Sequence, residues 1–229
     1  MKSSPTQPLL RDDQISEGDL QALAVQLGSM EGLDPMGEMG VILAFGATKD
    51  LAGLKNSLAR YKEEILFPIE WPAIRKAYEH ASRNEFRELV ALDRQLSGDA
   101  RLQPFAAASQ RVGRFHIKRL RPLRDQRLVQ RYLRLLDEGG VHAWHTLVYG
   151  VILALYSFPL RQGLMNYAQQ TLHGFIQAAA RGHPWTEIEM ELALDQLLAG
   201  APTAMESILA SPEIPVLPVP AAGAHDVIR

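Results

Sequence analysis

Apolar side chains recur at three- and four-residue steps along most of this chain, which is the spacing of one face of an α-helix. The clearest example predicts an amphipathic helix between Lys49 and Leu66, which Pro68 then breaks. Its apolar stripe consists of Leu51, Leu54, Leu58, Tyr61 and Ile65. No stretch alternates between apolar and polar residues as a half-buried β-strand does, so the pattern indicates helices throughout.

Residues that start and end helices divide the rest of the chain into further elements. Ser82 with Glu85 predicts a capping box, Thr186 predicts another N-cap, and Pro72 fits the first turn of a helix. By such signals we predict helices at residues 16–28, 72–81, 82–96, 104–121, 124–136, 159–181, 186–200 and 203–210, and a tight turn with a short buried helix within 33–48.

The segment that follows Gly140 is apolar nearly all round. From Val141 to Tyr156 it reads VHAWHTLVYGVILALY, which predicts the central buried helix of the protein. It falls short of the roughly 20 residues that cross a bilayer. Taken together, the elements predict an all-α fold, a single-domain compact bundle of about nine to eleven helices.

Both ends of the chain differ from this helical pattern. Residues 1–14 are rich in Ser, Pro and Gln, and residues 211–229 carry prolines too densely for a helix or a central strand. We therefore expect a flexible N-terminal tail at 1–14, one all-helical domain at 15–210, and a Pro-rich flexible C-terminal tail at 211–229.

Composition narrows the function classes. A formal net charge of −2 gives no global reason to expect binding to nucleic acid or to a membrane. The absence of cysteine excludes disulfides and thiol catalysis and fits a reducing compartment. With no apolar signal segment at the start of the sequence, we expect a cytoplasmic protein.

The strongest local charge bias is a run of arginines and lysines between residues 111 and 134. Arg111, Arg114, Lys118 and Arg121 follow helical spacing, so their side chains can share one face suited to an acidic protein surface or to phosphates. A plain solvated face is the alternative. Nucleic acid is disfavoured, because the aromatic residues of a single-strand binder are missing from the run.

Two histidines are the only candidate metal ligands that the spacing singles out. His142 and His145 stand three apart, so on a helix both imidazoles would face one ion, although two histidines make an incomplete shell. Packing or capping at a helix start is the competing interpretation. Catalytic templates are missing: Gly37, Gly40 and Gly46 form no phosphate loop, and no serine occupies a nucleophile elbow.

Several segments, in the right order and spacing, resemble the UreF family of all-α urease accessory proteins. They include Leu92 and Asp93, the Gly113–Arg114 pair, and the segment HTLVYG from His145 to Gly150. The long stretch PLRQGLMNYAQQTLHGFIQAAAR and an early Pro-x-Gly element at Pro35 and Gly37 extend the likeness over roughly residues 16–200. The family's late Pro-Leu-Gly-Gln element is replaced by Pro-Trp-Thr-Glu, which ends at Glu187.

The resemblance implies a function as well as a fold. A UreF-like protein is a non-catalytic scaffold in nickel delivery that homodimerises, docks on a UreD/UreH-type protein and recruits the UreG GTPase to the urease apoprotein. It implies no tightly bound cofactor, since the complex handles the nickel. The partner-binding residues we expect on this basis are Arg111, Arg114, Lys118, Arg121, Pro35, Gly37 and Glu187.

Two alternatives come from other classes of protein. One is a small helical enzyme with an apolar internal pocket that uses His145, Tyr149 or His173. The other is an unrelated regulatory helical module.

Overall fold

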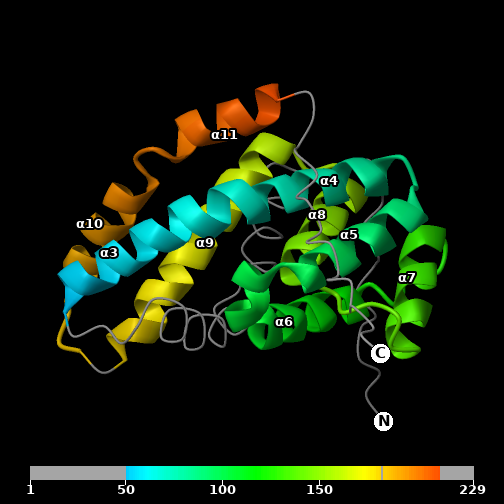
Figure 1. Cartoon of the computed structure of the whole chain (residues 1–229), viewed down its shortest axis with the longest axis horizontal. Coiled ribbons are helices and arrows are strands. Elements are labelled where there is room, and N and C mark those ends of the chain that lie inside the picture. Colours follow the sequence, from blue (N-terminus) through cyan, green and yellow to red (C-terminus); the bar gives the residue numbers. More distant parts are fainter. Residues whose placement is uncertain (1–49, 182, 212–229) are drawn as a thin grey trace, which may run out of the picture.

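A computed structural model describes residues 50–181 and 183–211, and every regular element within these ranges is a helix (Figure 1). In chain order the elements are α3 (Leu51–Tyr61), the π-helical η1 (Lys62–Glu70), α4 (Trp71–Ser82), α5 (Phe86–Gly98), the 3-10 helix η2 (Ala100–Phe105), α6 (Ala106–Arg119), α7 (Arg127–Asp137), α8 (His145–Leu155), α9 (Leu160–Ala180), α10 (Glu187–Leu198) and α11 (Ala201–Ala210). The predicted all-α class is confirmed. The elements predicted within residues 16–48, the tail at 1–14 and all of the C-terminal tail after Ser211 lie outside the described residues.

Within the described residues, the predicted nine to eleven separate helices are not matched, because several elements run into one another. α3, η1 and α4 are continuous from Leu51 to Ser82, so the predicted break at Pro68 is wrong. Pro68 lies inside η1, where the Trp71 N–H bonds to the Leu66 carbonyl five residues back. This wider turn accommodates a residue that has no N–H and whose ring crowds the preceding turn.

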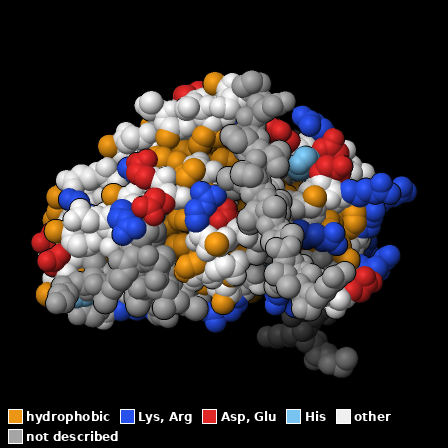
Figure 2. Space-filling model, in the orientation of Figure 1, with side chains coloured by type: hydrophobic (Ala, Val, Ile, Leu, Met, Phe, Trp, Pro, Cys, Tyr) orange, Lys and Arg blue, Asp and Glu red, His pale blue; other side chains and the backbone are white. Residues whose placement is uncertain are grey.

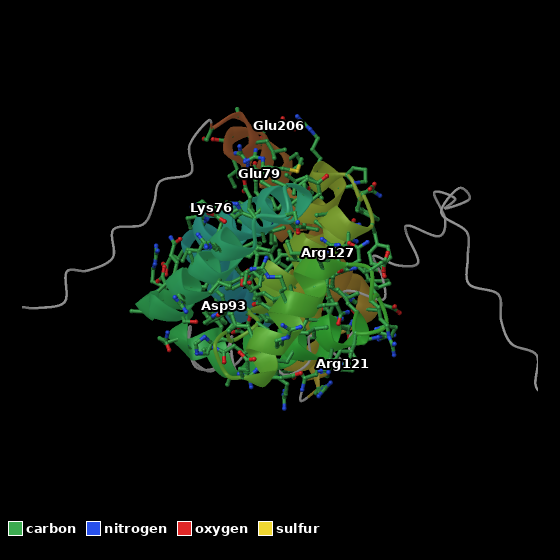
Figure 3. The ribbon with its side chains drawn as sticks, turned by 90° about the vertical axis from the view of Figure 1, so that its right-hand side faces the viewer. Lys76, Glu79, Asp93, Arg121, Arg127 and Glu206 are labelled. Carbon is green, nitrogen blue, oxygen red and sulfur yellow. The ribbon has the colours of Figure 1, made fainter. Side chains whose placement is uncertain are left out.

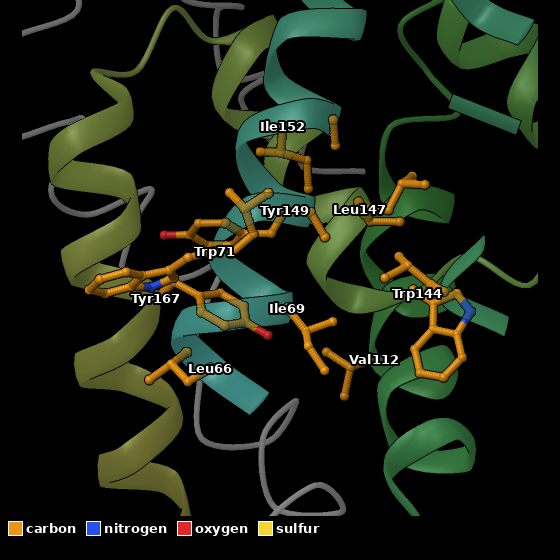
Figure 4. Close-up of a cluster of buried hydrophobic side chains, with 14 of the residues drawn as sticks. Leu66, Ile69, Trp71, Val112, Trp144, Leu147, Tyr149, Ile152 and Tyr167 are labelled. Carbon is orange, nitrogen blue, oxygen red and sulfur yellow. The ribbon is translucent and has the colours of Figure 1, made fainter. Parts of the chain in front are cut away.

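Helix α8 is the centre of the molecule. Its residues from His145 to Leu153 are all buried, which confirms the predicted central helix. It packs chiefly against α4 and α6 (Figure 4). The contact with α4 depends on Gly150, because a Cβ at this position would overlap the carbonyl oxygen of Ile74. The two helix backbones therefore approach more closely than any larger residue would permit.

The start of α8 corrects the sequence prediction. The helix begins at His145 instead of Val141, and the residues before it form a loop in which Ala143 has a φ of +60°. As predicted, two glycines close α7: Gly139 has a φ of +77°, and the Gly140 N–H donates to the Leu135 carbonyl.

Two predicted helix caps have different outcomes. The Thr186 hydroxyl and the Glu189 carboxylate form a reciprocal capping box at the start of α10. The predicted box of Ser82 and Glu85 is wrong: the Ser82 hydroxyl donates to the Tyr78 carbonyl at 2.8 Å, and the Glu85 carboxylate accepts from His80 instead. Contacts with residues of the last turns of α4 have replaced the predicted cap.

All the described helices contribute to one continuous cluster of buried apolar side chains. α10 and α11 pack along α9, and α10 also contacts α3. Just after α3, Lys62 Nζ of η1 donates to the Leu197 carbonyl of α10 at 3.2 Å. Within residues 50–181 and 183–211, no helix combines the length and apolar character that a membrane crossing requires.

Candidate functional site

Asp93, in the middle of α5, organises the loop between α7 and α8. Its side chain is fully buried and accepts hydrogen bonds from the backbone N–H groups of His142, at 2.8 Å, and Ala143, at 2.9 Å. The Tyr132 hydroxyl of α7 donates to the same carboxylate at 2.8 Å. A buried carboxylate is tolerated only with such partners, so one side chain ties α5, α7 and the loop together.

Helix α6 closes on the same loop from the other side. A Cβ at Gly113 would overlap the Ala143 carbonyl oxygen, so the helix and loop backbones touch here. The Ser109 hydroxyl accepts from the His145 N–H at 3.1 Å, and Arg114 Nε donates to the His142 carbonyl at 3.3 Å. The Asp93, Gly113–Arg114 and His145 segments, far apart in the sequence, thus meet at one junction.

The junction fixes the orientation of α6, whose outward side carries the predicted basic face. Arg111, Arg114 and Lys118 are all exposed along this side. Among them lies Phe115, whose side chain is 49% exposed, with the Arg119 guanidinium 5.5 Å from its ring centroid. Phe115 thus lies at the edge of the buried face of α6, among cations.

The fourth predicted cation lies beyond the end of α6. Arg121 is in the turn that follows the helix, and Arg121 Nη2 donates to both carboxylate oxygens of Asp137 at 3.2 and 3.0 Å. Figure 3 shows Arg121 and Arg127 on the side of the molecule that α7 forms. Lys and Arg side chains also gather over this end in the space-filling view (Figure 2). The basic surface therefore continues from α6 onto α7.

His142 and His145 occupy different surroundings. His142 is exposed, and its Nδ1 lies 3.2 Å from Asp93 and 3.0 Å from the Ser97 hydroxyl. His145 is buried and stacks on His116 with ring centroids 5.7 Å apart. They do not share a helix face, since α8 starts after His142. In the described part of the chain, no group of three or more His, Cys, Asp or Glu side chains is arranged to hold a metal ion.

A row of buried titratable side chains runs from His145 into the core. Burial, with the nearby His116, lowers the pKa of His145 to about 3. Burial, with Arg119 nearby, lowers the pKa of His116 to about 4. The Tyr167 ring lies 5.4 Å from the His145 ring. At neutral pH both imidazoles are uncharged, as their apolar surroundings require.

The row ends at Glu70, which is buried at the junction of η1 and α4. Burial raises the pKa of Glu70 to about 7, although its carboxylate accepts a hydrogen bond from the Tyr61 hydroxyl. A second tyrosine, Tyr167, contributes a smaller effect that lowers this pKa. Sequence spacing did not single out Glu70, because a lone acid in an apolar segment carries no motif.

The remaining predicted residues do not join this junction. Glu187 is exposed in the first turn of α10, beside Ile188, whose side chain is 70% exposed. His173 lies on α9, where its Nε2 is 3.3 Å from the Gln177 amide. Pro35 and Gly37 lie outside the described residues.

Comparison with known protein families identifies a family to which the chain is similar. The sequence model of the UreF family matches residues 48–198, about two thirds of the chain. This range contains α3 to α10 and every contact of the Asp93 junction. No curated protein shows significant similarity to the chain.

Proposed function

The chain belongs to the UreF family, which implies a urease accessory role, and from this premise we propose that it is a non-catalytic assembly factor in nickel delivery to urease. In this role it docks on a UreD/UreH-type protein and recruits or regulates the UreG GTPase. Urease apoprotein is the client. The nickel belongs to the complex and is not a tightly bound cofactor of this chain.

The observation that carries the proposal is the outward face of α6. It presents an exposed aromatic ring, Phe115, surrounded by Arg111, Arg114 and Lys118. Aromatic and arginine side chains dominate the binding energy of protein interfaces, and positive charges around them steer acidic partners. The Asp93 junction holds this helix against the rest of the fold, so the face needs little ordering when a partner binds.

The arrangement of the histidines supports a binding role over an enzymatic one. His145 and Tyr149 are buried, and the Tyr149 hydroxyl donates to the Gly163 carbonyl at 3.1 Å. His173, the third residue of the enzyme alternative, has its contact with Gln177. A general base must reach the proton it abstracts, and His145 and Tyr149 are enclosed by packed helices.

The proposal has further parts that follow from the family role. We propose a homodimer, a cytoplasmic location, and no binding to nucleic acid or membranes. Residues 15–210 would form one helical domain between the tails at 1–14 and 211–229. Glu187 and the Pro35–Gly37 element would be further contact points with partners.

Copurification of the full chain with its partners tests the proposal. The chain is coexpressed with the urease, UreD-type and UreG-type proteins of its own source and recovered through an affinity tag. The variant Arg111→Glu/Lys118→Glu should lose at least one partner. Recovery of no partner by the unaltered chain, or of every partner by this variant, would overturn the proposed role.

The matched control places the same charge change elsewhere. Arg87 and Arg94 are exposed on α5, and neither forms an ion pair with a described residue. The variant Arg87→Glu/Arg94→Glu should keep all partners. Loss of partners by both variants would show that net charge, and not the α6 face, governs the association.

A further inference from the structure

A hollow of about 820 Å³ lies between the end of α6 and the side of α7. Its lining contains no acidic side chain. The cationic residues around it, which define the basic hollow, are Lys118, Arg119, Arg121, Arg124 and Arg134. Only Arg121 among them forms an ion pair with a described residue. The hollow therefore concentrates positive charge that the described part of the fold leaves largely uncompensated.

The turn that forms the floor of the basic hollow is rigid. The Gln130 side chain of α7 donates to the carbonyls of Arg121, at 3.1 Å, and Leu123, at 2.9 Å. Backbone hydrogen bonds inside the turn add to these, including one from the Arg124 N–H to the Pro122 carbonyl. The backbone from which Arg121 and Arg124 project is thus held in place before any ligand arrives.

Helix stability does not account for cations at this place. α7 has no acidic residue in its first turn, and its N-cap, Gln126, makes no capping hydrogen bond through its side chain. Arg124 lies just before this helix start, followed by the exposed Asp125, and Arg127 is the first residue of the helix. Positive charge near the N-terminus of a helix opposes the helix dipole and is unfavourable. An anion bound at the hollow would reduce the part of this repulsion that Asp125 does not offset.

The surrounding groups favour a carboxylate over a phosphate. Arg121 already binds both oxygens of the Asp137 carboxylate. A guanidinium of this surface therefore pairs with a carboxylate within the protein itself. Phosphate sites built on turns use free backbone N–H groups. Here the N–H groups of Leu120, Arg121, Leu123, Arg124 and Gln126, which precede α7, all donate to carbonyls of the turn or of the last turn of α6.

The size and lining also argue against a nucleic acid. No aromatic side chain lines the hollow on which a base could stack. The volume exceeds what one small anion fills, and the cations extend from the end of α6 to Arg134 of α7. Several carboxylates on one polypeptide match this spread better than a single compact charge.

We propose that the basic hollow binds an acidic polypeptide segment of a partner protein, through carboxylates that pair with Lys118, Arg119, Arg124 and Arg134. The inference deepens the proposed function by naming the chemistry of one contact, and it rests on that function only for the identity of the partner. Binding itself is a property of the isolated chain. It can therefore be measured without urease or any accessory protein.

The test uses fluorescence anisotropy with the full chain and a labelled peptide of about twelve residues that alternates Glu and Gly. Binding should be detectable, should weaken as salt is raised, and should be lost with a matched Gln–Gly peptide. The variant Arg124→Glu/Arg134→Glu should weaken binding about tenfold or more. Arg87→Glu/Arg94→Glu, which has the same net charge, should leave it within about twofold.

Three results would overturn the inference. They are equal binding of the Gln–Gly peptide, equal losses in the two charge-reversal variants, and pyrophosphate binding in place of the peptide. Circular dichroism of both variants shows whether each is folded, and the milder Arg124→Gln/Arg134→Gln variant replaces one that is not. If peptide binding fails while copurification succeeds, the assembly role stands and only the acidic-segment contact is wrong.

Discussion

The buried carboxylate of Asp93 accepts a hydrogen bond from the backbone N–H of Ala143, fifty positions later in the chain, at 2.9 Å. Ala143 has a φ of +60°, a left-handed conformation that alanine rarely adopts. The hydrogen bond, together with the contact of Gly113 on the Ala143 carbonyl, holds this conformation in place. This pair of residues therefore decides where α8 begins and how α6 is oriented.

Asp93→Asn should destabilise the protein by about 3 kcal/mol, because an amide N–H₂ would face N–H donors and leave buried groups unpaired. Tyr132→Phe removes only one of the hydrogen bonds and should cost about 1 kcal/mol. Urea denaturation followed by circular dichroism measures both values. Equal effects of the two variants would contradict the central role of the carboxylate.

Gly113→Ala should destabilise the protein by about 2 to 3 kcal/mol, since its Cβ would overlap a backbone carbonyl that cannot rotate away. The control is Gly98→Ala at the end of α5, where a Cβ has no neighbour within 4 Å. The control should change the free energy of unfolding by less than about 1 kcal/mol. Thermal and urea unfolding of both variants decide the matter, and a harmless Gly113→Ala would refute the close contact.

Glu70 should make stability fall as pH rises. Its pKa is about 7 in the folded protein against an ordinary value of 4.5, so between these values the folded state holds a proton that the unfolded state has lost. The contribution of Glu70 to the free energy of unfolding is fully present below pH 4.5 and is lost by about pH 7. Glu70→Gln stays neutral, so its stability relative to the unaltered chain should rise by about 3 kcal/mol over this window.

Urea unfolding of both proteins at several pH values measures this difference. Tyr61→Phe is the useful comparison, because it removes the hydrogen bond to Glu70 while the carboxyl group remains. It should keep the pH-dependent loss that Glu70→Gln abolishes. A difference between Glu70→Gln and the unaltered chain that does not change with pH would show that Glu70 titrates normally.

His145 acts in the opposite direction. Its pKa falls from 6.5 to about 3 on folding. As the pH drops below 6.5, the imidazole binds a proton in the unfolded chain but stays neutral in the folded chain. The free energy of unfolding therefore declines. His145→Phe should reduce this decline by up to about 1.4 kcal/mol per pH unit. At neutral pH the variant should fold with similar stability, because the ring nitrogens have no hydrogen-bond partner in the described structure. An unchanged acid profile would count against the buried neutral imidazole.

Phe115→Ala should weaken partner binding without unfolding the protein. The ring is 49% exposed, so its removal should change the free energy of unfolding by less than about 1 kcal/mol. A central aromatic residue of an interface costs about 2 kcal/mol or more of binding free energy when truncated. Titration calorimetry with the purified partner measures the second effect. Leu192→Ala, which truncates another exposed side chain, 55% exposed and more than one turn away from Glu187 on α10, is the matched surface control. Unaltered affinity for every partner would remove Phe115 from the interface.

Local signals in the sequence determined the helical class and many helix ends. The apolar segment of α8, the glycines after α7 and the capping box at Thr186 each act over a few residues, so their effect can be deduced without the fold. The same holds for the basic face of α6, because helical spacing alone aligns Arg111, Arg114 and Lys118. The segments that resemble the UreF family could also be identified from the sequence. The sequence did not show why Asp93 and Gly113 occupy their positions in them.

Tertiary contacts decided the rest. The loop before His145 depends on side chains supplied by distant segments. Asp93 accepts hydrogen bonds from the N–H groups of His142 and Ala143 and so stabilises a non-helical loop before α8. His142 therefore lies in the loop, whereas His145 lies in the helix. The residue pattern of the loop could not predict this conformation, because the side chain that stabilises it lies on another helix.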